Sequence, residues 1–580
     1  MPLPEFTGTL GLKRAAHLLR RATFGATKQQ MDAFATLTPA QAIVQLFRQT
    51  LPDPVLPLDP STGQEWFITG TTDANSPEDD LQKYFKAWFI GQILSTGIDP
   101  AHSLAYSTRE KVVFFLHTHF TTIQSKVNNS RSLYFQNQLL RLFALDAMNP
   151  DPLINFKELS VKISIDNAML RLLDGDLNVK GSPNENYARE FHELYSIGRG
   201  LEGTLPAPSG SGDYILFTEE DVQSAARVFS GWQVDEDFQT IDADTNLRRG
   251  KIKGNVLDAS AHDNDIKQFS ARFNNSTIQA DPTLLNGGQA TEESALDEIR
   301  QLVDQIYNKP ETARNICWKI YRYFVYAPHT PDDSVAIDNS IIAEMASTFV
   351  ASNYKIQPVI ENLLRSQHFY EAGAGVNDDN FGGIIKSPLD LVAGTLRLFS
   401  VPLPDMTTQT VEFYAAADTI VGTLGDLGMN FFEPYDVAGY EAYHQFPIYH
   451  RSWITPNYLA NRYAFIRHVI TATENSMFQI DVYQFVKNNF PNAVAEDART
   501  LIIELAKYLL PVSDNLTFDG AADDNAGLTA ERLNYFKERF LQQFDEAYWT
   551  DRWNRGLADL RDQLEFLFNA MLQSPEYQLS

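Results

Sequence analysis

The chain has 580 residues and a formal net charge of -27, and 44% of its residues are hydrophobic and 12% aromatic. A chain of this length can bury roughly three quarters of its unfolded surface, so we expect a large core. The acidic balance argues against a nucleic-acid partner, because such proteins need a basic surface to neutralise phosphates. The single cysteine, Cys317, excludes an intrachain disulfide and a zinc site built from thiolates.

The sequence carries no signal for a membrane span. No run of 18 apolar residues occurs, and the amino terminus, MPLPEFTGTLGLKRAAHLLRR, lacks the apolar core of a secretory signal. We therefore expect no transmembrane segment and a cytoplasmic location by default, with export by another route left open.

The first part of the chain shows helical periodicity. A basic amphipathic helix is predicted over residues 10–24, a second helix follows Thr38-Pro39, and a third begins after Pro77. Residues 107–110 have the pattern of a capping box, which predicts that a helix opens there and continues through KVVFFLHTHF.

His117 and His119 close this predicted helix and are candidate metal ligands. Residues two apart lie on the same side of a strand but about 200° apart on a helix. The two imidazoles can therefore bind one ion together only if the helix ends or distorts there, which the following Thr121-Thr122 favours. The alternative is structural: His119 packs among apolar neighbours while His117 caps the end of the helix.

The stretch from Ser182 to Gly198, SPNENYAREFHELYSIG, predicts one helix of about four turns. Ser182 and Glu185 have the spacing of a capping box, and Pro183 stands at the first helical position. Gly198 predicts a left-handed stop.

Charged side chains share one face of this predicted helix. Glu190 and Glu193 are close enough to hold one metal ion or to share one proton, and Arg189 lies four residues before Glu193. The alternative is a solvated face with Glu185–Arg189 and Arg189–Glu193 ion pairs, each stabilising the helix by a few tenths of a kcal/mol.

The remaining chain divides by pattern. Thr218 and Asp221 predict the capped start of another helix, and Gly231 predicts its end. Residues 232–290 are rich in Asn, Asp and Gly, which predicts a small β-hairpin or irregular insertion near 235–280 that contains His262 and Asp263. The predicted fold is mainly α, with helices packed in layers. We expect one unit over 1–580, made of an N-terminal helical part (1–231), the insertion (232–290) and a C-terminal helical part (291–580).

Two common catalytic signatures are missing from the sequence. The glycines of LGDLGMNFF have neither the spacing nor the lysine of a phosphate-binding P-loop. No Gly-x-Ser-x-Gly elbow occurs, and the nearest serine-glycine run, PSGSGD, has no strand-to-helix context. Nucleotide binding and Ser-His-Asp chemistry are therefore not expected.

Several separated stretches together resemble one family. They are AAHLLRRATFG, FFLHTHFTT, PNENYARE with ELYSIG, FTEEDVQSAARVFSGW, the AHD element with its lysine, and LGMNFFEPYDVAGY before SWITPN. In this order they are similar to the large bacterial family called the domain of unknown function numbered 1800. The resemblance implies a partner: members are often encoded beside a protein with a sulfatase-like or phosphatase-like look. Many members also carry export signals, which this sequence does not show.

The resemblance also implies which residues form the family's motifs. By position these are His17, Arg20, Arg21, Phe24, Gly25, His117, His119, Phe120, Asn184, Glu185, Asn186, Arg189, Glu190, Glu193, Arg227, Gly231, Trp232, His262 and Asp263.

Two functions remain open from the sequence. The first is a metal-dependent hydrolase, in which His117, His119, His262 and Asp263 bind Zn, Mn or Fe, a glutamate of the Glu190/Glu193 pair takes the proton of a bound water, and Arg189 steadies negative charge. The second is a non-catalytic structural or assembly protein that works with a protein partner, in which the same polar residues form a buried and fully bonded network.

Overall fold

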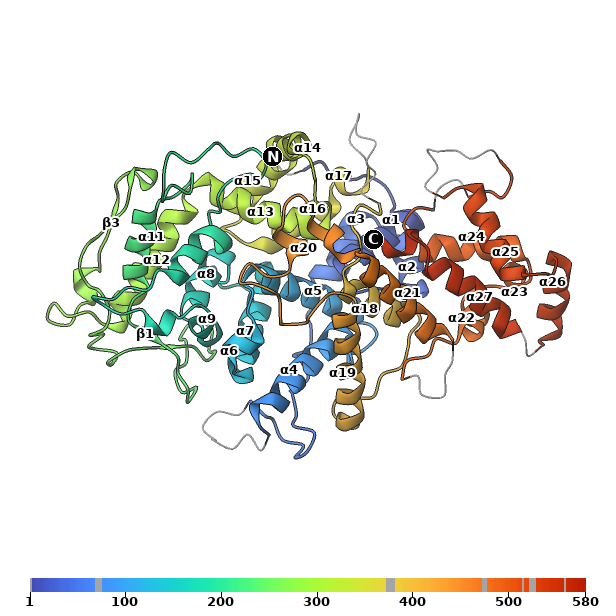
Figure 1. Cartoon of the computed structure of the whole chain (residues 1–580), viewed down its shortest axis with the longest axis horizontal. Coiled ribbons are helices and arrows are strands. Elements are labelled where there is room, and N and C mark those ends of the chain that lie inside the picture. Colours follow the sequence, from blue (N-terminus) through green and yellow to red (C-terminus); the bar gives the residue numbers. More distant parts are fainter. Residues whose placement is uncertain are drawn as a thin grey trace.

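The computed structural model describes residues 3–67, 76–371, 381–471, 477–513, 516–520, 528–557 and 560–580. The chain is mainly α-helical, as predicted, and forms an elongated body (Figure 1). Helix α5 (Ser103–His119) lies in the middle of this body, and nearly all of its side chains are buried. None of the helices in the described ranges combines the length and the apolar character needed to cross a membrane.

The first helices build the centre of the body. Helix α1 packs against α2, α5 packs against α3 and α7, and α4 reaches outward beside a later helix, α19 (Thr410–Asp426). Their bounds are α1 (Gly11–Ala22), α2 (Lys28–Ala35), α3 (Pro39–Phe47), α4 (Glu78–Ile93), α6 (Gln124–Val127) and α7 (Ser130–Ala144).

One end of the body holds the insertion and the helices that carry it. Two short antiparallel sheets form there, with Trp232 opposite Ile252 and Lys267 opposite Ile278. The elements are α8 (Phe156–Ser164), α9 (Asn167–Leu172), α10 (Asn186–Glu190), π-helix η3 (Phe191–Tyr195), α11 (Glu219–Val228), β1 (Trp232–Gln233), β2 (Lys251–Ile252), β3 (Lys267–Gln268), β4 (Thr277–Ile278) and α12 (Glu292–Tyr307). The predicted β insertion is thus two small sheets joined by irregular chain.

The middle of the body is completed by the following block. Proline occupies the first turn of several helices here, where its missing N–H costs no bond. The elements are α13 (Pro310–Phe324), α14 (Pro331–Ile337), π-helix η6 (Asp338–Ile342), α15 (Ala343–Ala351), α16 (Ile356–Arg365), α17 (Gln367–Tyr370), α18 (Pro388–Leu398), α20 (Glu441–His444) and α21 (Pro456–Ile470).

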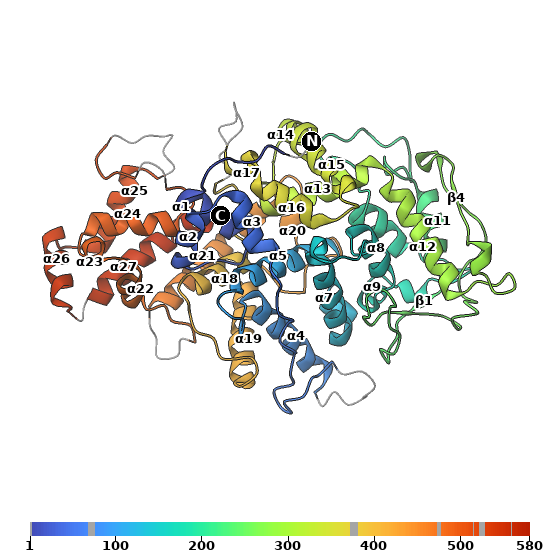
Figure 2. The same cartoon turned by 180° about the vertical axis from the view of Figure 1, so that it is seen from behind.

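The last helices form the opposite end of the body, as both views show (Figures 1 and 2). They are α22 (Val482–Asn489), α23 (Asn492–Ala495), α24 (Ala498–Leu509), α25 (Ala530–Leu541), α26 (Glu546–Arg555) and α27 (Leu560–Leu572). Helix α24 returns to pack against α1, so the two ends of the sequence meet in the core. Short 3-10 turns complete the chain at η1 (Asp146–Met148), η2 (Gly175–Leu177), η4 (Ala271–Phe273), η5 (Pro282–Leu284), η7 (Tyr449–Trp453) and η8 (Glu576–Gln578).

Helix starts show where local signals suffice and where they fail. Thr218 caps α11 with both bonds of a capping box, as predicted, and Thr38 forms the same kind of box at the start of the helix predicted after it, α3. The box predicted at 107–110 is wrong, because α5 already begins at Ser103. The box predicted at Ser182 is also wrong: Ser182 is held in a bridge with Val179, and the helix begins only at Asn186. The Asn184 side chain accepts a hydrogen bond from the Asn186 N–H at 2.9 Å instead.

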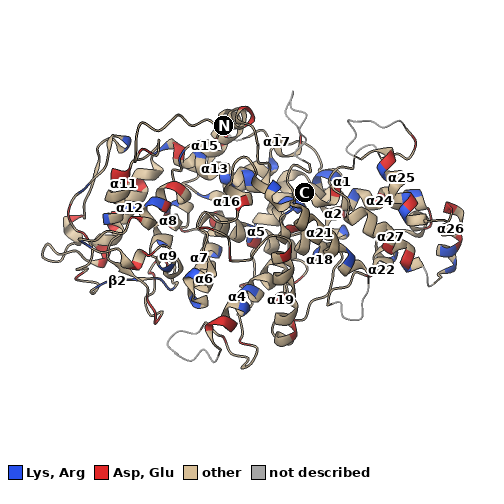
Figure 3. Ribbon diagram, viewed as in Figure 1, with Lys and Arg blue, Asp and Glu red and all other residues tan. Residues whose placement is uncertain are grey.

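Positively and negatively charged residues are interspersed along the ribbon in every part of the body (Figure 3). Most ion pairs in the described ranges join segments distant in sequence, so charge contributes to how the helices dock rather than only to individual helix faces.

Candidate functional site

The helix predicted from Ser182 to Gly198 is shorter and changes type halfway. After α10 the chain widens into the π-helix η3, and Gly198 ends it with φ of 72° and an N–H bonded to the His192 carbonyl at 2.8 Å. Tyr187, Phe191 and Tyr195 of this segment are buried. The wider turn places one more residue in each turn, so Glu193 is displaced from the row that starts at Arg189.

Arg189 is anchored to α11. Its guanidinium donates to both carboxylate oxygens of Glu219, at 2.7 and 2.8 Å, and to Glu185 at 3.1 Å. The hydrogen bonds from Arg189 are the main cause that holds the pKa of Glu219 at about 2. The predicted Glu185–Arg189 pair is confirmed. The predicted Arg189–Glu193 pair is wrong, because Glu193 pairs with Arg199 at 2.7 Å.

Glu190 differs from its charged neighbours. It is half-buried, and no hydrogen bond or ion pair of its carboxylate occurs within the described ranges. Burial, followed by the negative charge of Glu193, raises the pKa of Glu190 to about 7, and Asp436 adds to the same effect. The predicted proximity of Glu190 and Glu193 therefore has an electrostatic consequence.

His117 and His119 end α5, as Thr121-Thr122 predicted, but they contact different neighbours. The His117 ring stacks on Phe432 with centroids 4.1 Å apart, and neither of its nitrogens has a hydrogen-bond partner among the described residues. Burial lowers the pKa of His117 to about 3. His119 places Nε2 3.0 Å from the Tyr195 carbonyl, and burial lowers its pKa well below the usual value. Both imidazoles are thus neutral core groups.

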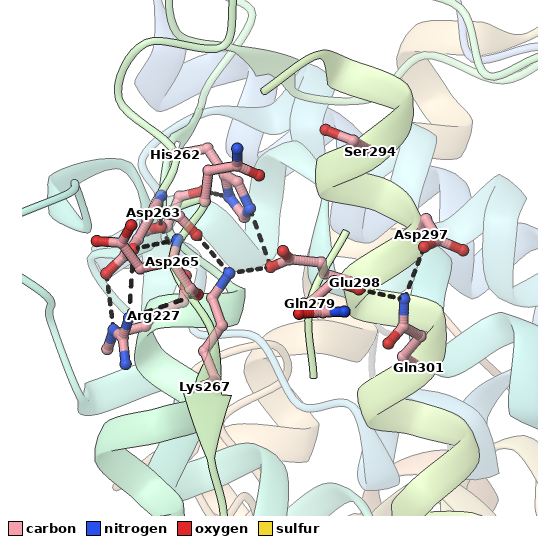
Figure 4. Close-up of polar contacts among 12 residues, drawn as sticks. Arg227, His262, Asp263, Asp265, Lys267, Gln279, Ser294, Asp297, Glu298 and Gln301 are labelled. Carbon is pink, nitrogen blue, oxygen red and sulfur yellow. Dashed lines mark hydrogen bonds and ion pairs between the residues drawn. The ribbon is translucent and has the colours of Figure 1, made fainter. Parts of the chain in front are cut away.

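His262 and Asp263 join the insertion to the helices (Figure 4). His262 places Nδ1 2.9 Å from the Ser230 carbonyl and Nε2 3.1 Å from the Glu298 carboxylate. Lys267 donates to the same Glu298 oxygen, and all three side chains are fully buried. Asp263 accepts from Arg227 on α11 at 2.7 Å. Burial lowers the pKa of Lys267, which the Glu298 charge opposes.

The predicted ligand clusters do not gather around one point. Across the described ranges, no group of three or more His, Cys, Asp or Glu side chains is placed to hold a metal ion. His117 faces Phe432, His262 faces Glu298, and Asp263 faces Arg227. The residues proposed as metal ligands are therefore bonded or packed separately.

The chain matches the family described as Protein of unknown function (DUF1800) over residues 17–579. The chain belongs to this family. No curated protein and no solved structure matches it. Membership in DUF1800 therefore confirms the resemblance seen in the sequence motifs, and the roles of those motifs have to come from their contacts.

The first motif of this DUF1800 member packs on α18. His17 lies between the rings of Phe369 and Phe381, with centroids 4.4 Å away on each side. Gly25 has φ of 113°, and a Cβ there would lie 2.7 Å from the Gly394 Cα. No larger residue fits at position 25 without moving α18.

Several polar residues of this member were missed in the sequence. Glu298, which is buried, and Lys319, which is half-buried, are partners of the motif segments, but each is separated from its contacts by many residues. Glu219 lies in the FTEEDVQSAARVFSGW motif, and its pairing with Arg189 spans 30 positions. The amphipathic pattern of each helix gave no signal for these pairs, because periodicity reports only which face is buried.

Proposed function

We propose that this DUF1800 chain is a non-catalytic structural or assembly protein, whose polar motifs hold its helices together. The observation that carries the proposal is the forked bond between Arg189 and Glu219. A forked guanidinium–carboxylate pair fixes both orientation and distance between two elements. It therefore ties α10 to α11 at the position where the hydrolase hypothesis needed a free cation.

The other motif residues support the same role. Asp263 is bonded to Arg227, His262 to Glu298, and Glu193 to Arg199. A catalytic acid or base must reach a proton of the substrate, and a metal ligand must offer a lone pair to the ion. These side chains are instead bonded to other side chains of the protein.

In the proposed role, the chain acts together with a protein partner. Its net charge of -27 disfavours a polyanionic partner such as nucleic acid, because like charges repel and no counterions would be released on binding. We expect the partner to be recovered in fixed stoichiometry with the chain.

A second candidate function is an acid–base enzyme, such as a hydrolase, with Glu190 as the proton acceptor. Its support is the half-buried carboxylate whose pKa lies at about 7, near the optimum for a general base at neutral pH. A zinc, manganese or iron cofactor remains part of this candidate only as a proposal. The predicted ligands do not fit one ion together in the described part of the chain, so no step is derived through a metal.

A double-mutant cycle on Arg189 and Glu219 tests the structural role. Arg189→Gln and Glu219→Gln should each reduce the free energy of unfolding in urea, and the two losses should be coupled by about 1 kcal/mol. The solvent-exposed pair Arg555–Asp551 provides the matched control, where we expect coupling of about 0.3 kcal/mol. Equal coupling in the two cycles would contradict the anchoring role of Arg189.

Elemental analysis separates the two candidates. We expect the chelator-free wild type to contain no near-stoichiometric Zn, Mn or Fe. Near-stoichiometric metal in the wild type that is lost in Glu190→Gln and His119→Gln, with both variants folded, would overturn the structural proposal. A hydrolytic activity that Glu190→Gln removes would favour the enzyme in the same way.

A further inference from the structure

A cavity lies where the two ends of the sequence meet in the core, between α1, α18, α24 and the last residues of the chain. It has a volume of about 40 Å³ and is partly open to solvent. Its lining includes two cations, Arg20 and Lys386, together with Asp390, Tyr508 and Tyr577. It does not include any residue of the Glu190 or His262 clusters.

Positive charge exceeds negative charge around this cavity. Lys386 and Arg462 are buried, and Arg20 is half-buried. None of these three forms an ion pair with a carboxylate in the described part of the chain. Asp390 and Ser580, the last residue, supply the carboxylates in the lining, and Asp390 is already paired with a fourth cation, Lys111. The Asp390 charge offsets part of the positive charge of Lys386 and Arg462, but these three cations have no carboxylate within ion-pair distance in the described ranges.

The bonds of these cations leave donors available. Arg20 donates one hydrogen bond, to the Tyr508 carbonyl at 2.7 Å. Lys386 donates one, to the Tyr577 carbonyl at 2.6 Å, with its ammonium 3.7 Å from the centroid of the Tyr577 ring. A guanidinium carries five N–H donors and an ammonium three, so both groups keep hydrogens for another acceptor.

Arg397 shows what a purely structural arginine does in the same neighbourhood. Arg397 lies on α18, the helix that carries Asp390. It donates to the carbonyls of Gly25, Leu94 and Ser103 and to the Ser95 hydroxyl, at 2.9 to 3.3 Å. Backbone acceptors can therefore satisfy a buried guanidinium in this core. The single bond of Arg20, beside an open cavity, is a different arrangement.

Burial without a counterion is costly for these groups. It lowers the pKa of Arg20 and of Arg462 to about 10, and it is also the largest cause that lowers the pKa of Lys386. For Lys386 the positive charges of Arg20 and Arg462 act in the same direction. An anion in the cavity would reverse this cost, because an opposite charge favours the protonated form.

We propose that the cavity lined by Arg20 and Lys386 is a binding site for a tetrahedral oxyanion, either inorganic phosphate or sulfate, or the phosphate or sulfate group of a small ester. The surplus of more than one positive charge matches a dianion better than a single carboxylate. The planar fork of Arg20 and the point charge of Lys386 are the two usual ways in which proteins hold such groups. The aromatic rings of the lining would contact the ester substituent.

Isothermal titration of the full chain with inorganic phosphate, at constant ionic strength set with chloride, tests the site. We expect one saturable site in the wild type. Arg20→Gln and Lys386→Gln should each weaken phosphate binding at least about tenfold, equivalent to roughly 1.4 kcal/mol. Lys355→Gln is the matched control: Lys355 also donates to backbone carbonyls, at 2.8 and 3.2 Å, but lies outside the cavity, and its loss should leave the phosphate affinity unchanged.

Parallel titrations identify the source of the group. Sulfate should compete with phosphate in either case. Tighter binding of phenyl phosphate than of inorganic phosphate would indicate an ester, and the reverse order would indicate the free ion.

Two results would overturn the proposal. One is a wild type that shows no saturable heat with millimolar phosphate, sulfate or phenyl phosphate. The other is phosphate binding that Arg20→Gln and Lys386→Gln leave intact. If neither glutamine variant folds, Arg20→Lys keeps the charge but removes the fork, and it should weaken binding severalfold; unchanged affinity in that variant would also contradict the site.

Discussion

The region of α10, α11 and the insertion differs from the cavity near α1 in how its cations are paired. Around α10, α11 and the insertion, three buried or half-buried cations each meet a carboxylate: Arg189 meets Glu219, Arg227 meets Asp263, and Lys267 meets Glu298. Around the cavity, Arg20 and Lys386 donate hydrogen bonds to backbone carbonyls and form no ion pair with a carboxylate in the described part of the chain. In the first region the chain itself supplies the negative charges that compensate the cations. In the second region we propose that a bound anion supplies them. The two regions therefore predict different responses to the loss of one charge.

Glu298→Ala should produce the largest effect, because it breaks a balanced cluster. The substitution leaves the Lys267 ammonium and the His262 imidazole buried without their shared acceptor. Breaking a buried ion pair from one side costs about 3–5 kcal/mol. The free energy of unfolding in urea should fall by that amount.

The neighbouring residue supplies the control for this prediction. Asp297 lies on the same helix, is partly exposed and accepts only from Gln301 at 2.7 Å. Asp297→Ala should change the free energy of unfolding by no more than about 0.5 kcal/mol. Similar losses in the two variants would mean that the buried network adds nothing beyond an ordinary helix-surface contact.

The sequence predicts the elements better than it predicts these clusters. Thr38, Thr218 and Pro310 mark helix starts through contacts within one turn, and such signals can be read locally. Glu190 and Glu193 were placed together correctly because they share one helix. In contrast, the bond from His262 to Glu298 spans 36 positions, and Arg20 and Lys386 come from opposite parts of the sequence. Only the packing of whole helices brings these residues together.

Local signals also fail where a distant or irregular contact replaces them. Ser182 has the right spacing for a cap, but a bridge with Val179 uses its backbone. The π-helix η3 after Glu190 has no sequence signature. Within it, Glu193 forms its ion pair with Arg199 instead of Arg189. Of the two ion pairs predicted for Arg189, the pair with Glu185 forms, whereas Glu219 takes the place of Glu193 in the other.

Glu190 belongs to neither kind of cluster, and its response to pH should be intermediate in size. Its pKa lies at about 7 in the folded chain and near 4.5 when unfolded. Below pH 4.5 both states are protonated, and the contribution of Glu190 to stability is fully present. As the pH rises from 4.5 through 7, the unfolded state releases its proton first, so this contribution is lost.

Urea titrations at several pH values check this sign. Between pH 5 and pH 8 the wild type should lose about 1 kcal/mol relative to Glu190→Gln, a value reduced from the full shift because the carboxylate is partly solvated. Glu220→Gln removes an exposed negative charge from α11 and should not reproduce the change. A wild type that gains stability relative to Glu190→Gln over this range would contradict the raised pKa.

Arg20→Gln should have the smallest effect, and it tests the comparison most directly. In buffer free of phosphate and sulfate, the substitution removes one bond to Tyr508 but also relieves the surplus of positive charge. These changes oppose each other, so we expect the free energy of unfolding to move by no more than about 0.5 kcal/mol. Arg397→Gln, which loses four bonds, should destabilise the chain more in the same buffer. Added phosphate should then raise the stability of wild type and Arg397→Gln but not of Arg20→Gln, because a ligand stabilises only the folded state that binds it. A large loss for Arg20→Gln without anion would place Arg20 among the balanced, structural charges and remove the difference between the two regions.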